Sequence, residues 1–269
     1  MKGSRFFKGY ALAYLVFLYA PILLLPIFAF NDGAIIAFPL KGFTTKWFEA
    51  MMGNATLGLA VRNSLIIAVS SAVIATCLGV FTARAMTRYK FPGKSGIVGL
   101  ITLPMVLPEI IVAVSLIAVL LGLGIELSIW TVILGHVLIC TPYTVAILNS
   151  AFSSLDRSLE EAAIDLGETR ISTFRLITLP LVAPGIISSL LITFTISLDE
   201  FIIAYFLAGS QQTLPVYIFS QFRFPQQVPV IMALGTVLVV ISILLLSIAE
   251  YFRRRGIAKS GGKDTGGFI

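Results

Sequence analysis

Three acidic residues stand inside long apolar stretches of this sequence. Glu109 follows Pro104 and Pro108 in one stretch, and Asp199 and Glu200 are neighbours in another. A carboxylate in the hydrocarbon core of a membrane is costly, and such residues usually mark the path of an ion or a substrate. Three carboxylates without a buried cation repel one another unless a cation joins them or some stay protonated. They therefore indicate either a site for a cationic substrate or a structural role in ion pairing and helix packing.

A polar stripe accompanies the acidic pair. Its members recur at spacings of four, four and three, which puts them on one face of a helix. They are Ser189, Thr193, Ser197 and Glu200, and Thr195 and Asp199 widen the stripe. We expect this face to line a water-filled path or a contact between helices. Because Arg62 and Arg84 lie at the ends of apolar stretches, the cationic substrate is favoured over ion pairing inside the membrane.

Few other residue types offer chemistry. Tyr19 and Trp47 are candidates for an aromatic face toward a cation, although such residues more commonly serve as interfacial or packing groups. His136 is interpreted as a packing residue, and Cys77 and Cys140 as buried free thiols. The spacing of Cys and His fits no metal site.

The composition requires that these residues be positioned by membrane helices. Of 269 residues, 58% are hydrophobic and 12% are charged, whereas a soluble domain has about 25% charged residues. A hydrocarbon core about 30 Å thick needs about 20 apolar residues in a helix. Six stretches qualify: Tyr10 to Phe30, Asn63 to Ala85, Ile97 to Leu123, Ile129 to Leu148, Leu181 to Leu207, and Val228 to Tyr251. The expected fold is an all-α membrane protein with six transmembrane helices in one domain, residues 10–251.

The basic residues predict the orientation of these helices. If the N-terminus is inside, all but four of the 19 Lys and Arg residues lie in inner segments, and the outer four are Lys41, Lys46, Arg62 and Arg223. This asymmetry predicts that residues 1–9 and 252–269 are cytoplasmic. The first stretch is interpreted as a retained anchor, and the last ten residues as a disordered tail.

The inner connection, residues 149–180, contains an amphipathic helix. Ser158 and Glu161 form a capping box that predicts the start of the helix, and Gly167 suits its C-terminal end. Its apolar stripe consists of Leu159, Ala162, Ala163 and Leu166. A second short amphipathic segment follows before Pro180. From these features alone, a helix lying on lipid headgroups and a helix docking onto a partner protein are equally open.

The same loop carries a family resemblance. Glu161-Ala162-Ala163, Gly167 and Ile177-x-Leu179-Pro180 match the EAA loop of ABC importer permeases at every position. In that family the loop is the coupling helix that seats in a cleft of a cytoplasmic ATPase. The resemblance implies the type I importer permease (MetI-like) fold. It also implies that Glu161, Ala162, Ala163, Leu166 and Gly167 form the ATPase contact.

Three further blocks resemble the permeases of spermidine/putrescine importers: Gly42 to Trp47, Leu107-Pro108-Glu109 and Ser197 to Glu200. The resemblance implies import of a polyamine from periplasm to cytoplasm, with substrate contacts from Glu109, Asp199, Glu200, Trp47 and Tyr19. Asp-Asp is common in that family where this chain has Asp199-Glu200, and Asp where it has Glu109. The charges are kept, and the particular polyamine stays open.

The resemblance also implies the assembly: a second, homologous permease, two copies of an ATPase and a periplasmic binding protein. The sequence has no P-loop, so ATP and Mg²⁺ would be bound by the ATPase. This chain is expected to be a transport subunit rather than an enzyme, with no cofactor of its own and no nucleic acid partner. The alternatives are an importer of another small organic solute and a proton-coupled secondary transporter that uses the three acids. An intramembrane hydrolase lacks a visible nucleophile with its base.

Overall fold

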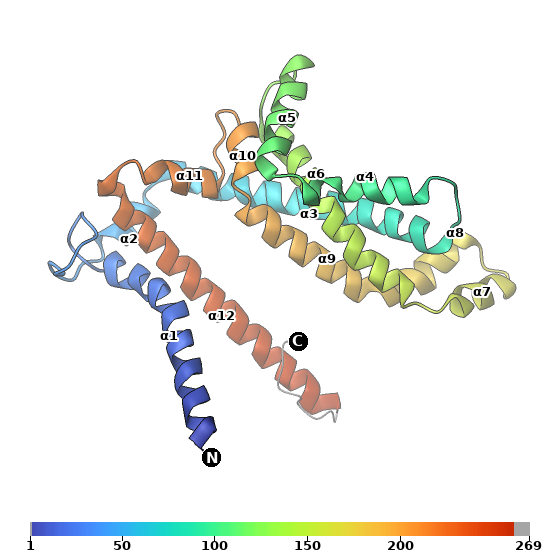
Figure 1. Cartoon of the computed structure of the whole chain (residues 1–269), viewed down its shortest axis with the longest axis horizontal. Helices are drawn as coiled ribbons and strands as arrows, with labels where there is room; N and C mark the ends of the chain where they lie inside the picture. Colours follow the sequence, from blue (N-terminus) through green and yellow to red (C-terminus); the bar gives the residue numbers. More distant parts are fainter. Residues whose placement is uncertain (1, 261–269) are drawn as a thin grey trace. The chain divides into compact units, whose positions relative to one another are not determined.

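A computed structural model describes the backbone of residues 2–260 and the side chains of 7–244 and of Ser247. Most of the predicted disordered tail, residues 261–269, lies outside this part. The described chain is helical (Figure 1), with one isolated β-bridge between Asn31 and Phe43. It divides into two compact units. Unit 1 consists of Met1–Ala55 and Ile218–Ile269, and unit 2 of Thr56–Tyr217.

Unit 1 is built from α1 (Lys2–Ala29), α2 (Lys46–Met52) and α12 (Val228–Ser260). Both α1 and α2 pack against α12. The connection between α1 and α2 is organised by Asn31, which is buried. Its Oδ1 accepts a hydrogen bond from the Lys41 N–H at 2.8 Å, and its backbone oxygen accepts one from Trp47 Nε1 at 2.8 Å. The Phe30 ring stacks on that of Phe43, with centroids 5.1 Å apart.

Unit 2 holds the three acidic residues and the inner loop. Its helices are α3 (Ala55–Arg88), α4 (Lys94–Val106), α5 (Glu109–Gly122), α6 (Ile129–Ser153), α7 (Arg157–Asp165), α8 (Arg170–Thr173), a π-helical turn (Phe174–Thr178), α9 (Leu179–Asp199) and α10 (Ile202–Leu207). The chain leaves through α11 (Leu214–Gln221) and a 3₁₀ turn (Pro225–Gln227). Helix α6 packs along α9, and α10 packs against both α5 and α6. Figure 1 places α7 and α8 at the end of this unit that lies away from α5 and α10.

Small residues allow the helices of unit 2 to approach closely. A Cβ at Gly79 of α3 would stand 2.6 Å from Thr144 Oγ1 of α6, and one at Gly135 would stand 2.4 Å from Ile203 Cγ2 of α10. Thr144 Oγ1 donates to the backbone oxygen of Ala75 at 2.9 Å. Because lipid provides no hydrophobic force between helices, such small residues and interhelical hydrogen bonds are what hold a membrane bundle together.

The number of predicted spans agrees with the structure when one broken pair is taken as a single span. Five described segments are long and apolar enough to cross a membrane: Phe7–Ala29, Ala55–Arg88, Ile129–Ser153, Arg170–Asp199 and Pro225–Leu244. The sixth is the pair α4 and α5, which bend by 107° at their junction. The stretch from Ile97 to Leu123, predicted as one transmembrane helix, is therefore two helices.

The breaks follow from local backbone chemistry. Leu107 is extended, with φ −79° and ψ 141°, because the ring of Pro108 disfavours helical geometry in the residue before it. Pro108 also has no N–H to continue the helix. The prediction for the fifth span, Leu181 to Leu207, was wrong at both ends. The helical segment begins at Arg170 and runs through Pro180, and it stops at Asp199 before the separate helix α10.

Candidate functional site

The two helix breaks bring the three acidic residues together. Glu109 is the first residue of α5, Asp199 is the last residue of α9, and Glu200 follows it. Because α5 packs against α10, the two breaks lie in the same part of unit 2. The charges of Glu109 and Asp199 both interact electrostatically with the carboxylate of Glu200. Residues 90 positions apart in the sequence thus form one acidic cluster.

The three carboxylates differ in what they contact. Glu109 and Asp199 are exposed in this chain, whereas Glu200 is only 8% exposed. Glu200 Oε1 accepts a hydrogen bond from the Ile203 N–H at 2.8 Å, so it satisfies a backbone donor in the first turn of α10. The two ion pairs among the described side chains, Lys46–Asp32 and Arg88–Glu160, do not involve this cluster. Glu109 and Asp199 are therefore available to a cation, while Glu200 also supports the fold.

The polar stripe of α9 is a contact between helices. Ser189, Thr193 and Ser197 are buried. The hydroxyl of Ser189 lies 3.3 Å from that of Thr76 on α3, and Ser197 Oγ lies 2.7 Å from His136 Nδ1 on α6. Of the two expectations for this face, the packing contact fits and the water-filled path does not. Thr195 and Asp199, which flank the stripe, are exposed.

The predicted aromatic contacts lie in the other unit. Tyr19 is exposed on α1. Trp47 is the second residue of α2. Its indole N–H donates to the backbone oxygen of Asn31, and Lys46 Nζ lies 4.7 Å from the centroid of its ring. Both belong to unit 1 and the acidic cluster to unit 2, so their grouping stays a prediction. The interpretation of Cys77 as a buried thiol was wrong, because Cys77 is exposed on α3.

The amphipathic helix of the inner loop begins earlier than the capping box predicts. Helix α7 starts at Arg157, and its N-cap is Asp156, whose Oδ1 accepts from the Ser158 N–H at 3.0 Å. This hydrogen bond lowers the pKa of the Asp156 carboxyl. Aspartate is among the best N-cap residues, and its charge suits the positive end of a helix. The predicted cap at Ser158 was therefore wrong, and Glu161 has no capping role.

Gly167 terminates α7 at its C-terminal end, as the sequence predicts. Gly167 has φ +95°, in the left-handed region that glycine adopts without a steric cost. The Gly167 N–H donates to the oxygen of Ile164 at 2.9 Å, and the Glu168 N–H donates to that of Ala163 at 3.0 Å. These two bonds are the Schellman arrangement that satisfies the last carbonyls of a helix.

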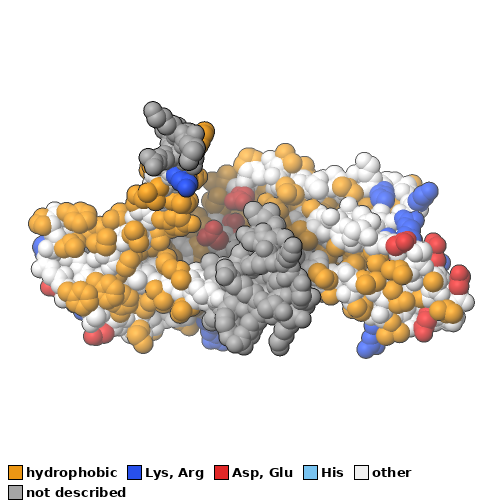
Figure 2. Space-filling view, turned by 90° about the horizontal axis from the view of Figure 1, so that it is seen from below, with side chains coloured by type: hydrophobic (Ala, Val, Ile, Leu, Met, Phe, Trp, Pro, Cys, Tyr) orange, Lys and Arg blue, Asp and Glu red, His pale blue; other side chains and the backbone are white. Residues whose placement is uncertain are grey.

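One residue of the EAA motif, Ala163, is buried against the permease, and the other motif residues in and beside α7 are exposed. Ala163 is 4% exposed, whereas Glu161, Ala162 and Gly167 are exposed and Leu166 is 87% exposed. Further exposed apolar residues on and beside the helix are Leu159, Ile164, Ile171 and Leu176. The loop thus presents apolar surface and an acidic side chain together at one end of unit 2. Figure 2 shows charged side chains of both signs gathered at this end.

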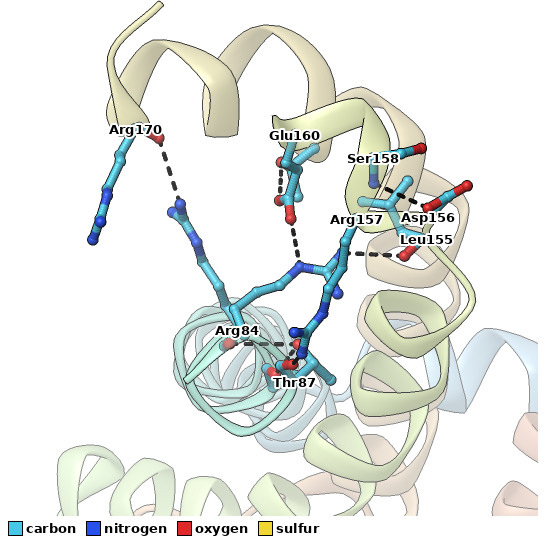
Figure 3. A network of polar contacts seen from close by, with 11 residues as sticks. Arg84, Thr87, Leu155, Asp156, Arg157, Ser158, Glu160 and Arg170 are labelled. Carbon is cyan, nitrogen blue, oxygen red and sulfur yellow. Dashed lines mark hydrogen bonds and ion pairs between the residues drawn. The ribbon is translucent and has the colours of Figure 1, made fainter. Parts of the chain in front are cut away.

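A network of polar contacts under α7 involves a residue that sequence reasoning missed. Arg88 Nε donates to Glu160 Oε2 at 2.5 Å, and Thr178 Oγ1 donates to Glu160 Oε1 at 2.5 Å. Arg88 also donates to the backbone oxygen of Leu155 at 3.3 Å. Figure 3 shows Glu160 lying between α7 and the end of α3. The only signal in the sequence is an acid beside the motif, because its partners are 72 and 18 positions away.

Basic residues that the sequence assigned only to membrane orientation also complete this network. Arg157 donates to the backbone oxygen of Thr87, and Lys94 to that of Met86. These carbonyls belong to the last turn of α3, where helix carbonyls have no partner within the helix. The Arg84 guanidinium lies 4.1 Å from the centroid of the Phe174 ring. The end of α3 is thereby fixed to the loop that carries α7.

Comparison with known proteins identifies the class to which this fold and these sites belong. Residues 75–257 match the family described as the binding-protein-dependent transport system inner membrane component, and the chain belongs to that family. It is a multi-pass permease of the bacterial inner membrane. A solved bacterial ABC transporter for import of the acidic polysaccharide alginate has a chain with the same fold. Its TM-score is 0.71 at 17% identity, covering 94% of this chain and 98% of that one. The predicted type I importer fold is thus confirmed.

Its relatives are more specific. The spermidine/putrescine transport system permease protein PotC of Haemophilus influenzae is 37% identical over 255 residues, covering 94% of this chain and 98% of that protein. The putrescine transport system permease protein PotI of Escherichia coli K12 is 38% identical over 231 residues, covering 82% and 81%. The family resemblance stated from the sequence motifs is confirmed.

Proposed function

We propose that this chain is the permease subunit of an ATP-driven importer that moves polyamines from the periplasm to the cytoplasm. The observation that carries the proposal is the acidic cluster of Glu109, Asp199 and Glu200 at two helix breaks. A polyamine carries two or more ammonium groups at neutral pH, and an unpaired ammonium in hydrocarbon is prohibitively costly. The names of the PotC and PotI relatives support the same substrate class.

The geometry explains how such a cluster would serve transport. Irregular backbone inside a membrane is tolerated where it is buried in protein or lines a water-filled cavity, so the breaks beside Glu109 and Asp199 favour a path there. These two exposed carboxylates would receive ammonium groups in turn. The buried Glu200 would add negative charge beside these two carboxylates, and it would also stabilise the first turn of α10. Because each ammonium group would contact one carboxylate at a time, each contact would be weak enough to release the substrate.

The opposite end of unit 2 would receive the driving force. In this proposal the exposed Glu161, Ala162, Leu166 and Gly167 seat against a cytoplasmic ATPase, and the buried Ala163 holds α7 to the permease. Two ATPase copies would bind ATP and Mg²⁺, and a homologous second permease and a periplasmic binding protein would complete the importer. In this proposal α7 and both termini lie in the cytoplasm, and the asymmetry of the basic residues supports that orientation.

Uptake in cells and in proteoliposomes tests this function. We expect ATP-dependent uptake of spermidine or putrescine that competing polyamines reduce and that neutral or anionic solutes leave unchanged. Uptake of a neutral or anionic solute alone would replace the polyamine with another small organic solute. Uptake that persists after ATP depletion and stops with a protonophore would instead establish the proton-coupled secondary transporter.

A further inference from the structure

Glu160 joins three elements through one carboxylate. It stands on α7, its Oε2 pairs with Arg88 at the last position of α3, and its Oε1 accepts from Thr178 immediately before α9. Both members of the ion pair are largely shielded from water, with side chains 11% exposed for Arg88 and 14% for Glu160. Charge-assisted bonds in such surroundings are short and directional. The neighbouring Glu161, by contrast, is exposed and makes no ion pair among the described side chains.

The segment that Glu160 holds through Thr178 has unusual winding. Phe174 to Thr178 form a π-helical turn, and the Leu179 N–H bonds to the oxygen of Phe174, five residues earlier. Single π turns are rare and occur mostly at functional sites. Thr178 is fully buried, and α7 packs against this turn. The Glu160 carboxylate therefore fixes the register of an irregular turn at the very entry of α9.

Helix α9 continues from this turn to the acidic cluster. It runs from Leu179 to Asp199, which is about 30 Å of helix at about 1.5 Å per residue. A displacement of α7 that is carried to Thr178 thus acts on the base of the helix whose other end bears Asp199. Arg88 would carry the same displacement to α3, so both helices would move with α7.

We propose that Glu160 is a positioning residue for energy coupling, a latch that ties α7 to α3 and α9. The inference rests on the proposed function, in which α7 is the ATPase contact. Glu161 and Glu160 then have separate tasks, although they are adjacent: Glu161 faces the ATPase, and Glu160 transmits its movement into the membrane. Loss of the latch should leave the ATPase bound and active while transport is no longer driven.

The test uses the complete importer in proteoliposomes and measures three quantities: ATPase co-purification, ATP hydrolysis, and polyamine uptake per ATP hydrolysed. We expect Glu160→Ala to keep co-purification and hydrolysis while uptake per ATP falls at least about tenfold, the loss of one or more charge-assisted bonds. Thr178→Val, which keeps the ion pair, should reduce uptake per ATP by a smaller factor. The matched control, Glu161→Ala, should weaken co-purification instead. The charge swap Arg88→Glu with Glu160→Arg should recover part of the uptake that either single change removes.

Normal uptake per ATP in Glu160→Ala overturns the latch, and so does a loss of co-purification equal to that of Glu161→Ala. If Glu160→Ala fails to accumulate in membranes, Thr178→Val decides, and an unchanged uptake per ATP in that variant overturns the inference. A failure of the proposed function is distinguishable from both. In that case Glu161→Ala leaves ATPase co-purification intact, or the wild-type importer takes up no polyamine.

Discussion

The acidic cluster leads to a quantitative prediction about substrate charge. Glu109→Gln and Asp199→Asn each replace a carboxylate by an amide of nearly the same shape, so the helices should pack as before. Both side chains are exposed and neither forms an ion pair among the described side chains. The changes therefore remove negative charge without leaving a buried partner unpaired. If ammonium groups pass here, transport should fall and assembly should not.

The size of the effect follows from the electrostatics of the site. An ammonium and a carboxylate about 4 Å apart attract by about 4 kcal/mol at an effective dielectric constant of about 20. Partial dehydration of the ammonium offsets part of this, and hydrogen bonds to charged groups contribute a net stabilisation of about 1.5–3 kcal/mol. At about 1.4 kcal/mol per factor of ten, each variant should reduce uptake at limiting substrate by about 10- to 100-fold. Because both residues interact with Glu200, the two effects should not be additive.

The assay is initial uptake of labelled spermidine and putrescine, with ATPase co-purification and binding of the periplasmic receptor measured on the same preparations. Glu126→Gln is the matched control, since Glu126 is exposed in the connection between α5 and α6 and outside the cluster. It should transport at the wild-type rate. If the double variant of Glu109 and Asp199 also transports at the wild-type rate, the cationic-substrate interpretation is refuted, although the importer family stands.

The remaining predictions concern coupling, packing and topology. Gly167→Pro should leave the membrane helices folded and stop uptake, because proline can neither adopt φ +95° nor donate the hydrogen bond that ends α7. Wild-type uptake in this variant would contradict the coupling role. Gly135→Leu should destabilise the purified protein by about 1–3 kcal/mol in a thermal unfolding assay. Gly99→Leu should not, because a side chain at that position meets open space. Equal melting temperatures for the two variants would contradict the close packing at Gly135. In a background without native cysteines, a cysteine at Thr45 should react with an impermeant thiol reagent in intact cells and one at Ser172 should not, and the reverse pattern overturns the orientation.

The features that the sequence predicts well are those set by neighbouring residues. Gly167 predicts the end of α7 because the left-handed conformation depends on that residue and its immediate neighbours. The apolar stretches are identified because the thickness of a bilayer sets their length. Pro108 predicts an interruption in the third span, since its effect on Leu107 is local. Pro108 does not predict the size of the bend, 107°, or the packing of α5 against α10, which joins segments far apart in the sequence.

The features that the sequence does not reveal are pairings between distant residues. Ser197 on a polar stripe is compatible with a water-filled path until His136, 61 positions away, is found beside it. Glu160 looks like one more solvent-facing acid of an amphipathic helix until Arg88 is placed against it. Ser158 and Glu161 fit a capping box in the sequence, yet the cap is Asp156, whose Oδ1 accepts from the Ser158 N–H.

The position of Glu109 at the start of α5 bears on how a highly charged solute would be released. Aligned peptide dipoles give the N-terminus of a helix a partial positive charge, and α5 is a helix of 14 residues with Glu109 in its first turn. This partial charge lies beside the carboxylate and offsets part of the attraction that it exerts on an ammonium group. A carboxylate in the middle of a continuous helix would lack that offset and would hold a polyamine more tightly. The break at Pro108 therefore does more than bend the chain. In the proposed path, we expect the attraction of Glu109 to replace lost hydration and still to be weak enough to release the cation.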